Sequence, residues 1–238
     1  MDDVDSDNRF SSDFAFWQAG DGSWLDELHT SWVVTDGLKE ISDRASMGNQ
    51  NALYFFFPWL TTALLGESEF SLRLPSLLAS LLLILTAYSL VSWATGSRLG
   101  GLTTACLLAV DPYCIFYAQE ARVYAGLQLV GLLHIGLMCR LLHRPDGKTR
   151  AAFVLVAIVL FYLHYTTIFL LAAEAIGYLL LWCRRSWRPC YRWPSFGLDV
   201  SWVFLGCLPA AGHLWEIAQR RANWNLFISN DVKLSDLP

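Results

Sequence analysis

The chain has 238 residues, of which 55% are hydrophobic and only 16% are charged. The charged share is well below the roughly 25% of ordinary soluble domains, so the composition excludes that class. From residue 72 onward, continuous apolar runs are long enough to cross a bilayer, which takes about 20 residues as a helix. We therefore predict an all-α, polytopic helical membrane protein. The net charge of −4 says little by itself, and no nucleic-acid partner is expected.

The N-terminal part is acidic: residues 1–70 carry 13 of the 21 acidic residues and three basic ones. We expect residues 1–19 to form a disordered acidic tail and residues 20–70 to form an extracytoplasmic first loop. In "DGSWLDELHTSWVV", the i, i+4, i+8 spacing of Trp24, Leu28 and Trp32 predicts an amphipathic helix at the membrane interface. A second interfacial segment follows in "GNQNALYFFFPWLTTALLG", which is too short to cross and is broken by Pro58.

Residues 71–220 are expected to form the transmembrane module, with about six spans. The predicted spans cover about 72–94 with Pro75 in the first turn, 101–117 interrupted at Asp111-Pro112, 121–142, two helices within 151–182 separated at "HYTT", and 199–217. Residues 221–238 would form a tail on the outer side.

Basic residues indicate the orientation. Nine of the 17 lie in the short loops at one end of these spans: Arg98, Arg140, Arg144, Lys148, Arg150, Arg184, Arg185, Arg188 and Arg192. By the positive-inside rule that end is cytoplasmic. The first loop, the "AQEAR" hairpin at 118–122, "HYTT" and the tail then lie outside together.

Asp26 has two interpretations. Ser23 and Asp26 have the spacing of a capping box, in which the acid supports the start of a helix. Alternatively, Asp26 is a general base beside a membrane-facing pocket, where it would take a proton from a nucleophilic hydroxyl. Asp26 and His29 would also suit a divalent metal, but two ligands do not define a site, and no metal ligand is assigned.

Charged residues between the second and third runs are stronger candidates. Glu120 and Arg122 either form a hydrated helix start or mark a site, since charge at membrane depth is costly. Arginine suits phosphate because of its planar fork. Arg73 either pairs with Glu69 four residues earlier or reaches an anionic head group. His164 is either a polar kink or part of a site at the same level.

Four blocks in order resemble a known family: "SWLDELHTSW", "NALYFFFPWLTTALLGESEFSLRLPSLLAS", "LLAVDPYCIFYAQEARVYA" and "VLFYLHYTTIFLL". Together they resemble the N-terminal membrane module of GT-C glycosyltransferases, in the branch of protein mannosyltransferases and aminoarabinose transferases. The resemblance covers about residues 20–185.

The resemblance implies a mechanism in a multi-pass protein of the cell (inner) membrane. A polyprenyl-phosphate sugar would donate to a lipid, glycan or protein hydroxyl at the outer face, with inversion. Asp26 matches the residue thought to activate the acceptor, and Glu27 completes the acidic pair. Arg122 matches a basic position near the donor phosphate, and Glu120 and Tyr124 belong to the same block. We assign Arg73 and His164 to the donor-phosphate region as well.

The chain also departs from the family. Relatives usually have a membrane helix before the Asp26-Glu27 pair, and "QNALY" stands where many have His-Pro-Pro-Leu. The chain ends at Pro238, roughly half the usual family length, so we expect a truncated product. The alternatives are a non-catalytic membrane protein built on this module, and a transporter whose path is lined by Glu120, Arg122 and Glu174.

Overall fold

The computed structural model describes residues 25–183 and 189–230, and every regular element in this part of the chain is a helix. The expected all-α class is confirmed. The helices are α2 (Leu25–Thr35), α3 (Ile41–Met47), α4 (Phe56–Leu65), α5 (Glu69–Thr95), α6 (Arg98–Val110), α7 (Pro112–Ala118), α8 (Tyr124–His143), α9 (Gly147–Leu163), η1 (Tyr165–Thr167), α10 (Ile168–Cys183), α11 (Trp193–Cys207), η2 (Leu208–Ala210) and α12 (Ala211–Asn230). The acidic tail, 1–19, lies outside the described residues.

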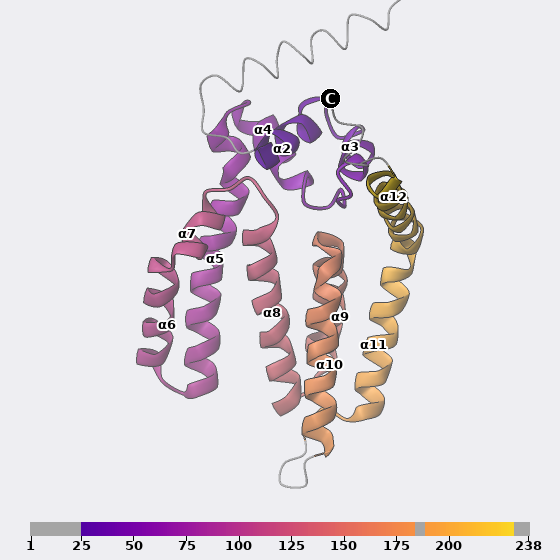
Figure 1. Cartoon of the computed structure of the whole chain (residues 1–238). Helices are drawn as coiled ribbons and strands as arrows, with labels where there is room; N and C mark the ends of the chain where they lie inside the picture. The colour runs from indigo at the N-terminus through magenta and orange to yellow at the C-terminus, as the bar shows by residue number, and fades with distance from the viewer. Residues whose placement is uncertain (1–24, 184–188, 231–238) are drawn as a thin grey trace, which may run out of the picture.

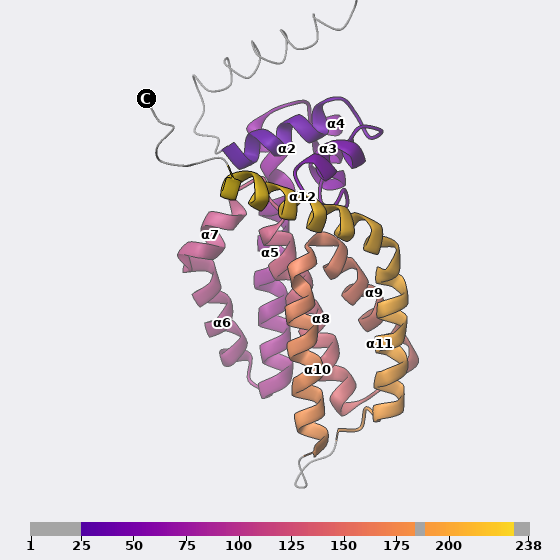
Figure 2. The same ribbon diagram turned by 45° about the vertical axis from the view of Figure 1, so that its right-hand side comes forward.

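The long helices stand side by side and the short ones gather at one end (Figure 1). At that end, α2, α3 and α4 lie over the tops of the long helices, and α12 runs across them from the end of α11 (Figure 2). We call it the capped end, made of residues 25–65, 119–123, 164–167 and 211–230. The opposite end, called the basic end, holds the connections 96–97, 144–146 and 189–192.

Four helical segments are long and apolar enough to cross a membrane: Glu69–Thr95, Tyr124–His143, Tyr165–Cys183 and Trp193–Arg220. The bent pair α6 and α7 makes a fifth if it counts as one span. Among the described residues this is fewer than the six spans expected. The difference is α9, which has 17 residues and opens with the polar turn Gly-Lys-Thr-Arg, so its apolar run begins only at Ala151.

The start of α5 corrects one boundary. The sequence predicted a helix from residue 72 with Pro75 in the first turn, but α5 begins at Glu69, which leaves Pro75 inside the helix. A reciprocal capping box explains the earlier start: the Ser71 amide donates to Ser68 Oγ at 3.2 Å and the Ser68 amide donates to Ser71 Oγ at 3.0 Å.

The predicted interruption at Asp111-Pro112 is confirmed. The axes of α6 and α7 differ by 64° there. Pro112 cannot donate a backbone hydrogen bond, and the Asp111 carboxylate instead caps α7 by accepting from the Cys114 amide at 2.8 Å.

Two apolar cores hold the helices, one near each end. The core at the capped end joins α2, α3 and the chain before α4 to α5, to 121–123 and to the end of α9. The core at the basic end joins α8, α9, α10 and the start of α11. Since the first core contains residues of the first loop and of the α7–α8 connection, the loop packs on that connection.

One buried polar contact links α8 and α10. His134 Nδ1 lies 2.7 Å from a carboxylate oxygen of Glu174, and the His134 ring, which is fully buried, stacks on Phe153 of α9 at 4.4 Å. Polar side chains among apolar helices face a partner because an unpaired one is costly in hydrocarbon. Glu174 therefore has a partner within the helix bundle.

Candidate functional site

The apolar face that the sequence predicted for the membrane interface is not the face that α2 buries in the protein. Leu28 and Trp32 of that face are half-buried, and Trp24 lies outside the described residues. The side chains that α2 buries are Glu27, Thr30, Val33 and Val34. A glutamate and a threonine occupy this face because both have polar partners on the chain beneath.

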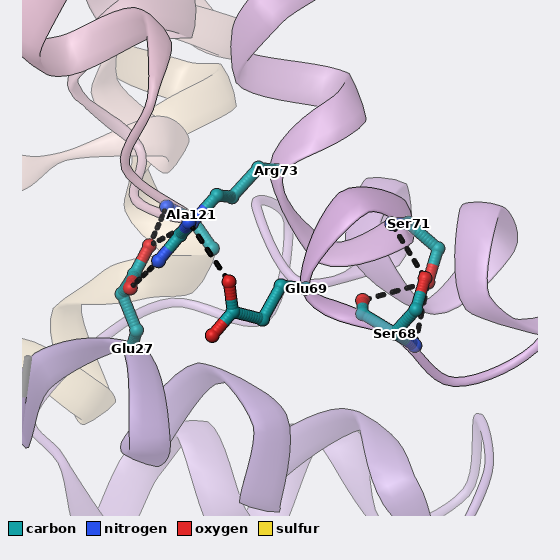
Figure 3. Close-up of polar contacts among 6 residues, drawn as sticks. All are labelled: Glu27, Ser68, Glu69, Ser71, Arg73 and Ala121. Atoms are coloured by element: carbon teal, nitrogen blue, oxygen red, sulfur yellow. Dashed lines mark hydrogen bonds and ion pairs between the residues drawn. The ribbon is translucent and has the colours of Figure 1, made fainter. Parts of the chain in front are cut away.

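Glu27 is the centre of these contacts (Figure 3). One carboxylate oxygen accepts from Arg73 Nη2 at 2.7 Å, and the other accepts from Arg73 Nε at 3.0 Å. The second oxygen also accepts from the Ala121 amide at 2.7 Å. The Glu27 side chain is only 5% exposed. A carboxylate buried to this extent is tolerated because it is paired and hydrogen-bonded.

Arg73 also binds Glu69, as the i, i+4 spacing predicted, with Nη1 donating at 3.1 Å. The Arg73 guanidinium thus faces two carboxylates, and the local charge of the three groups sums to −1.

Thr30 makes a second contact between α2 and Ala121. Thr30 Oγ1 donates to the Ala121 carbonyl at 2.9 Å, while Glu27 accepts from the Ala121 amide. Residues 27 and 30 are neighbours on one helix face, so both polar groups of Ala121 are bound to one side of α2. This fixes α2 against the α7–α8 connection.

Asp26 lies in the first turn of α2, directly before Glu27. Its side chain, like Ser23 and the predicted capping box, lies outside the described residues. The backbone of Asp26 is placed by its neighbour, whose carboxylate contacts Ala121, and Arg122 is the next residue along that connection.

Arg122 is one of the few buried charged residues, with 9% exposure. It lies in the non-helical connection 119–123, because α8 begins at Tyr124 rather than at the predicted residue 121. Ser76 Oγ donates to the Arg122 carbonyl at 3.2 Å, which ties the connection to α5. The site therefore combines a buried guanidinium with a backbone held from two helices.

Tyr54 lies near the charge of Arg122. It is 7% exposed, and burial raises the pKa of its phenol above the usual value. The nearby Ser76 hydroxyl and the positive charge of Arg122 oppose this rise in pKa, while the charges of Glu27 and Glu120 add to it. Tyr54 therefore stays protonated beside a cluster of opposite charges.

His164 follows the last residue of α9. Its Nδ1 lies 2.7 Å from Thr166 Oγ1. Burial lowers the pKa of His164, and the positive charge of Arg122 lowers it further. The candidates Arg122 and His164 are thus close enough for their charges to interact.

The neighbouring Tyr165 joins three segments of the capped end. Its hydroxyl accepts from Asn51 Nδ2 at 3.1 Å and lies 2.8 Å from His213 Nδ1 of α12. Arg220 of α12 donates to the Ser46 carbonyl at 2.7 Å. The first loop, η1 and α12 are therefore connected by polar contacts.

Glu120 and Tyr124 flank the Ala121-Arg122 pair. The Glu120 carbonyl accepts from the Arg122 amide at 2.8 Å, which closes the turn. Tyr124 is half-buried, and its ring centre lies 5.1 Å from that of Tyr117. These two residues shape the connection that presents Arg122.

The possible metal ligand His29 packs in an aromatic setting, with its ring centre 5.9 Å from that of Phe55 and 5.8 Å from that of Trp32. Gly48 lies against this ring, and a Cβ there would collide with it. Within residues 25–183 and 189–230, no three His, Cys, Asp or Glu residues group in a way that could hold a metal ion.

A sequence model of the dolichyl-phosphate-mannose-protein mannosyltransferase family matches residues 50–211, about two thirds of the chain. The chain belongs to this family. No curated protein and no solved structure matches the chain significantly. The mannosyltransferase match includes Arg73, Glu120, Arg122, Tyr124 and His164, and it begins after Asp26 and Glu27.

Sequence reasoning missed several residues of this candidate site. Thr30, Tyr54 and Ser76 are ordinary in their local sequence, and only the fold brings them to the α7–α8 connection. A weak signal existed for Thr30, because it stands three residues after Glu27 on the same helix face.

Proposed function

We propose that the chain transfers a sugar from a polyprenyl-phosphate donor to an acceptor hydroxyl at the extracytoplasmic membrane face, with inversion. Family membership supports the reaction class. The positive-inside rule supports the face, since the capped end lies opposite the basic end. A donor of this kind keeps its tail in hydrocarbon and its phosphate at the surface, where the capped end would meet it.

One observation carries the proposal: Glu27 binds the Ala121 amide at 2.7 Å. Asp26 is the residue before Glu27 and Arg122 is the residue after Ala121. The contact therefore brings the candidate base and the candidate phosphate ligand, from opposite parts of the sequence, into one neighbourhood.

In the proposed step, the Asp26 carboxylate takes the proton of the acceptor hydroxyl. The oxygen attacks the anomeric carbon, and the bond between that carbon and the phosphate oxygen breaks. The departing lipid phosphate gains negative charge, which Arg122 would stabilise because its buried guanidinium is less screened by water. His164, Glu120 and Tyr124 would line the donor-phosphate region.

Glu27 and Arg73 have a positioning role in this proposal. The contacts of the Glu27 carboxylate with Arg73 and Ala121 would leave it poorly available as a base. Arg73 binds Glu27 and Glu69, so its role would be to fix Glu27, and the proposal places the donor phosphate at Arg122, the position that the family resemblance implies.

The transporter alternative rested mainly on Glu174, an acid in the middle of an apolar run. Glu174 lies 2.7 Å from the buried His134, so pairing within the bundle accounts for it. Glu120 and Arg122 lie at the capped end rather than along the helices. The glycosyltransferase proposal assigns a role to Glu120 and Arg122 at that end.

The test is transfer of labelled mannose from dolichyl-phosphate-mannose by the purified chain with membrane extracts as the acceptor source. For Asp26→Asn we expect a loss of about 10²–10⁴-fold, as for the removal of general base catalysis. Asp43→Asn is the matched control, because Asp43 is an exposed acid of α3 on the same end. Transfer by Asp26→Asn at the control's rate would remove Asp26 from the base role.

A further inference from the structure

A groove runs between the second halves of α5 and α8, towards the basic end and away from the candidate site. It has a volume of about 520 Å³. Its walls are almost entirely apolar: Leu90 and Trp93 come from α5, and Leu132, Leu133 and Leu137 come from α8. Ser89 also lines it, but its hydroxyl donates to the Leu85 carbonyl of its own helix at 2.8 Å. Thr86 of α5 is the other hydroxyl residue of these walls, and the remaining lining side chains along them are apolar, so the groove suits a hydrocarbon chain.

Gly136 shapes the groove. A Cβ at this position would lie 3.3 Å from Leu90 Cδ1, which is tighter than an ordinary contact. Small residues let helices approach closely, so the absence of a side chain here allows Leu90 to pack against the α8 backbone.

The end of the groove is basic. Arg140 in the last turn of α8 and Arg144 at its C-cap both line it and are exposed. Among the described residues neither forms an ion pair. The acid whose charge interacts with Arg140 is Asp146, and its carboxylate already accepts from the Thr149 amide at 3.0 Å and the Thr149 hydroxyl at 2.6 Å. The C-terminal dipole of α8 contributes about half a negative charge, which two arginines exceed.

Trp93 marks the polar boundary of the groove. Its ring lines the groove, and the ring centres of Trp93 and His143 lie 5.9 Å apart with the ring planes nearly perpendicular. Tryptophan is enriched where hydrocarbon gives way to head groups. An apolar trough, a tryptophan and two arginines therefore follow one another towards the basic end, in the order of an acyl chain, a glycerol backbone and a phosphate.

We propose that this groove binds one anionic phospholipid, with an acyl chain between α5 and α8 and its phosphate between Arg140 and Arg144. Charge complementarity selects this occupant. A zwitterionic lipid carries its own cation next to the phosphate, which opposes the two arginines. This site lies at the end opposite Arg122 and goes beyond the proposed transfer reaction, on which it does not depend.

The test is native mass spectrometry of the detergent-purified chain with dioleoyl-phosphatidylglycerol or dioleoyl-phosphatidylcholine added. We expect phosphatidylglycerol to bind more tightly, as a single adduct. Arg140→Gln with Arg144→Gln should weaken its binding by more than tenfold, since each arginine near an anionic lipid contributes about fivefold. Binding of phosphatidylcholine should not change.

The matched control is Arg98→Gln with Lys148→Gln. It removes the same charge from the basic end, and neither residue lines the groove. An equal loss in this control would show that only the general positive field matters, and would overturn the proposal. Equal binding of the two lipids by the wild-type chain would also overturn it.

A second variant tests the groove without touching the arginines. Leu133→Trp places a larger side chain at a lining position that is 39% exposed, so folding should tolerate it. We expect it to weaken binding of dioleoyl-phosphatidylglycerol while leaving the short-chain dihexanoyl lipid almost unaffected. Unchanged dioleoyl binding by Leu133→Trp would contradict an acyl chain in the groove.

Discussion

Glu27 and Glu69 both bind Arg73, but in different surroundings. The Glu27 side chain is 5% exposed and shares two guanidinium contacts, whereas that of Glu69 is 33% exposed and makes one. Removing one partner of a buried pair leaves an uncompensated charge, while exposed pairs contribute little. At the residue scale, these two carboxylates therefore form a natural comparison.

We predict that Glu27→Gln destabilises the chain by about 3 kcal/mol, near the lower end for a buried pair because Arg73 is 30% exposed. Glu69→Gln should cost only about 0–1 kcal/mol. Thermal unfolding in detergent, followed by circular dichroism, measures both. Equal shifts would contradict the claim that Glu27 anchors α2.

His164 gives a pH-dependent prediction. Its pKa is lowered from 6.5 by burial and by the charge of Arg122. The folded chain then binds fewer protons at His164 than the unfolded chain does, so stability rises with pH between the lowered pKa and 6.5. As pH falls through this window, the wild type should lose stability relative to His164→Gln.

The measurement is a titration of the His164 ring by NMR, with the unfolding temperature recorded for both chains. Arg122→Gln should raise the midpoint, because it removes one of the two causes. A midpoint at or above 6.5 in the wild type would refute the arrangement that places His164 near Arg122.

The sequence predicted the contacts of some residues and not those of others. Glu69–Arg73 is local, so its spacing was sufficient. Glu27–Arg73 joins positions 46 apart and Thr30–Ala121 positions 91 apart, and no local pattern contains them. Sequence alone predicts that a glutamate such as Glu27 is exposed, because its partner Arg73 is distant in the sequence.

At the element scale, the pairing of α5 and α6 depends on one glycine. A Cβ at Gly101 would overlap Ser92 Oγ and lie 2.6 Å from the Tyr88 carbonyl oxygen. A backbone oxygen within a helix cannot move aside cheaply. Its neighbour Gly100 has no contact closer than 3.4 Å, to the Thr95 hydroxyl. The two glycines are adjacent in sequence and face different surroundings.

We predict that Gly101→Ala destabilises the chain by about 1–3 kcal/mol, the usual range for overpacking. Gly100→Ala should be neutral or slightly stabilising, because alanine favours helix more than glycine does. Thermal melts of the two variants under identical conditions provide the measurement. A larger effect from Gly100→Ala would show that α5 and α6 pack differently.

Elements were predictable where a single local signal decided them. Asp111-Pro112 gave the break between α6 and α7, and the short apolar run gave α4 as a helix too short to span, although Pro58 lies within α4 and does not break it. The predicted start of α5 was wrong because it was based on hydrophobicity alone and did not include the Ser68 cap. The buried face of α2 was missed because its partners lie on another part of the chain.

At the scale of the whole molecule, the two ends differ in charge. Exposed basic residues at the basic end include Arg98, Arg140, Arg144 and Lys148, whereas the first loop carries mostly acids. Basic residues in short loops favour the cytoplasmic side, and acids contribute little to that choice. The whole arrangement should therefore insert with the capped end outside.

We predict that Asp43→Cys reacts with a membrane-impermeant maleimide added to intact cells, while Lys148→Cys reacts only after permeabilisation. Both positions are exposed, on α3 and in the first turn of α9, and each is introduced after the six native cysteines are replaced by serine. Labelling of both after permeabilisation establishes that both thiols are reactive. The reverse pattern would put Arg122 at the cytoplasmic face, where a donor phosphate in the outer leaflet could not reach it. The same measurement therefore tests both the orientation and the proposed reaction. The reverse orientation would not affect the lipid groove, except that the groove would then face the other leaflet.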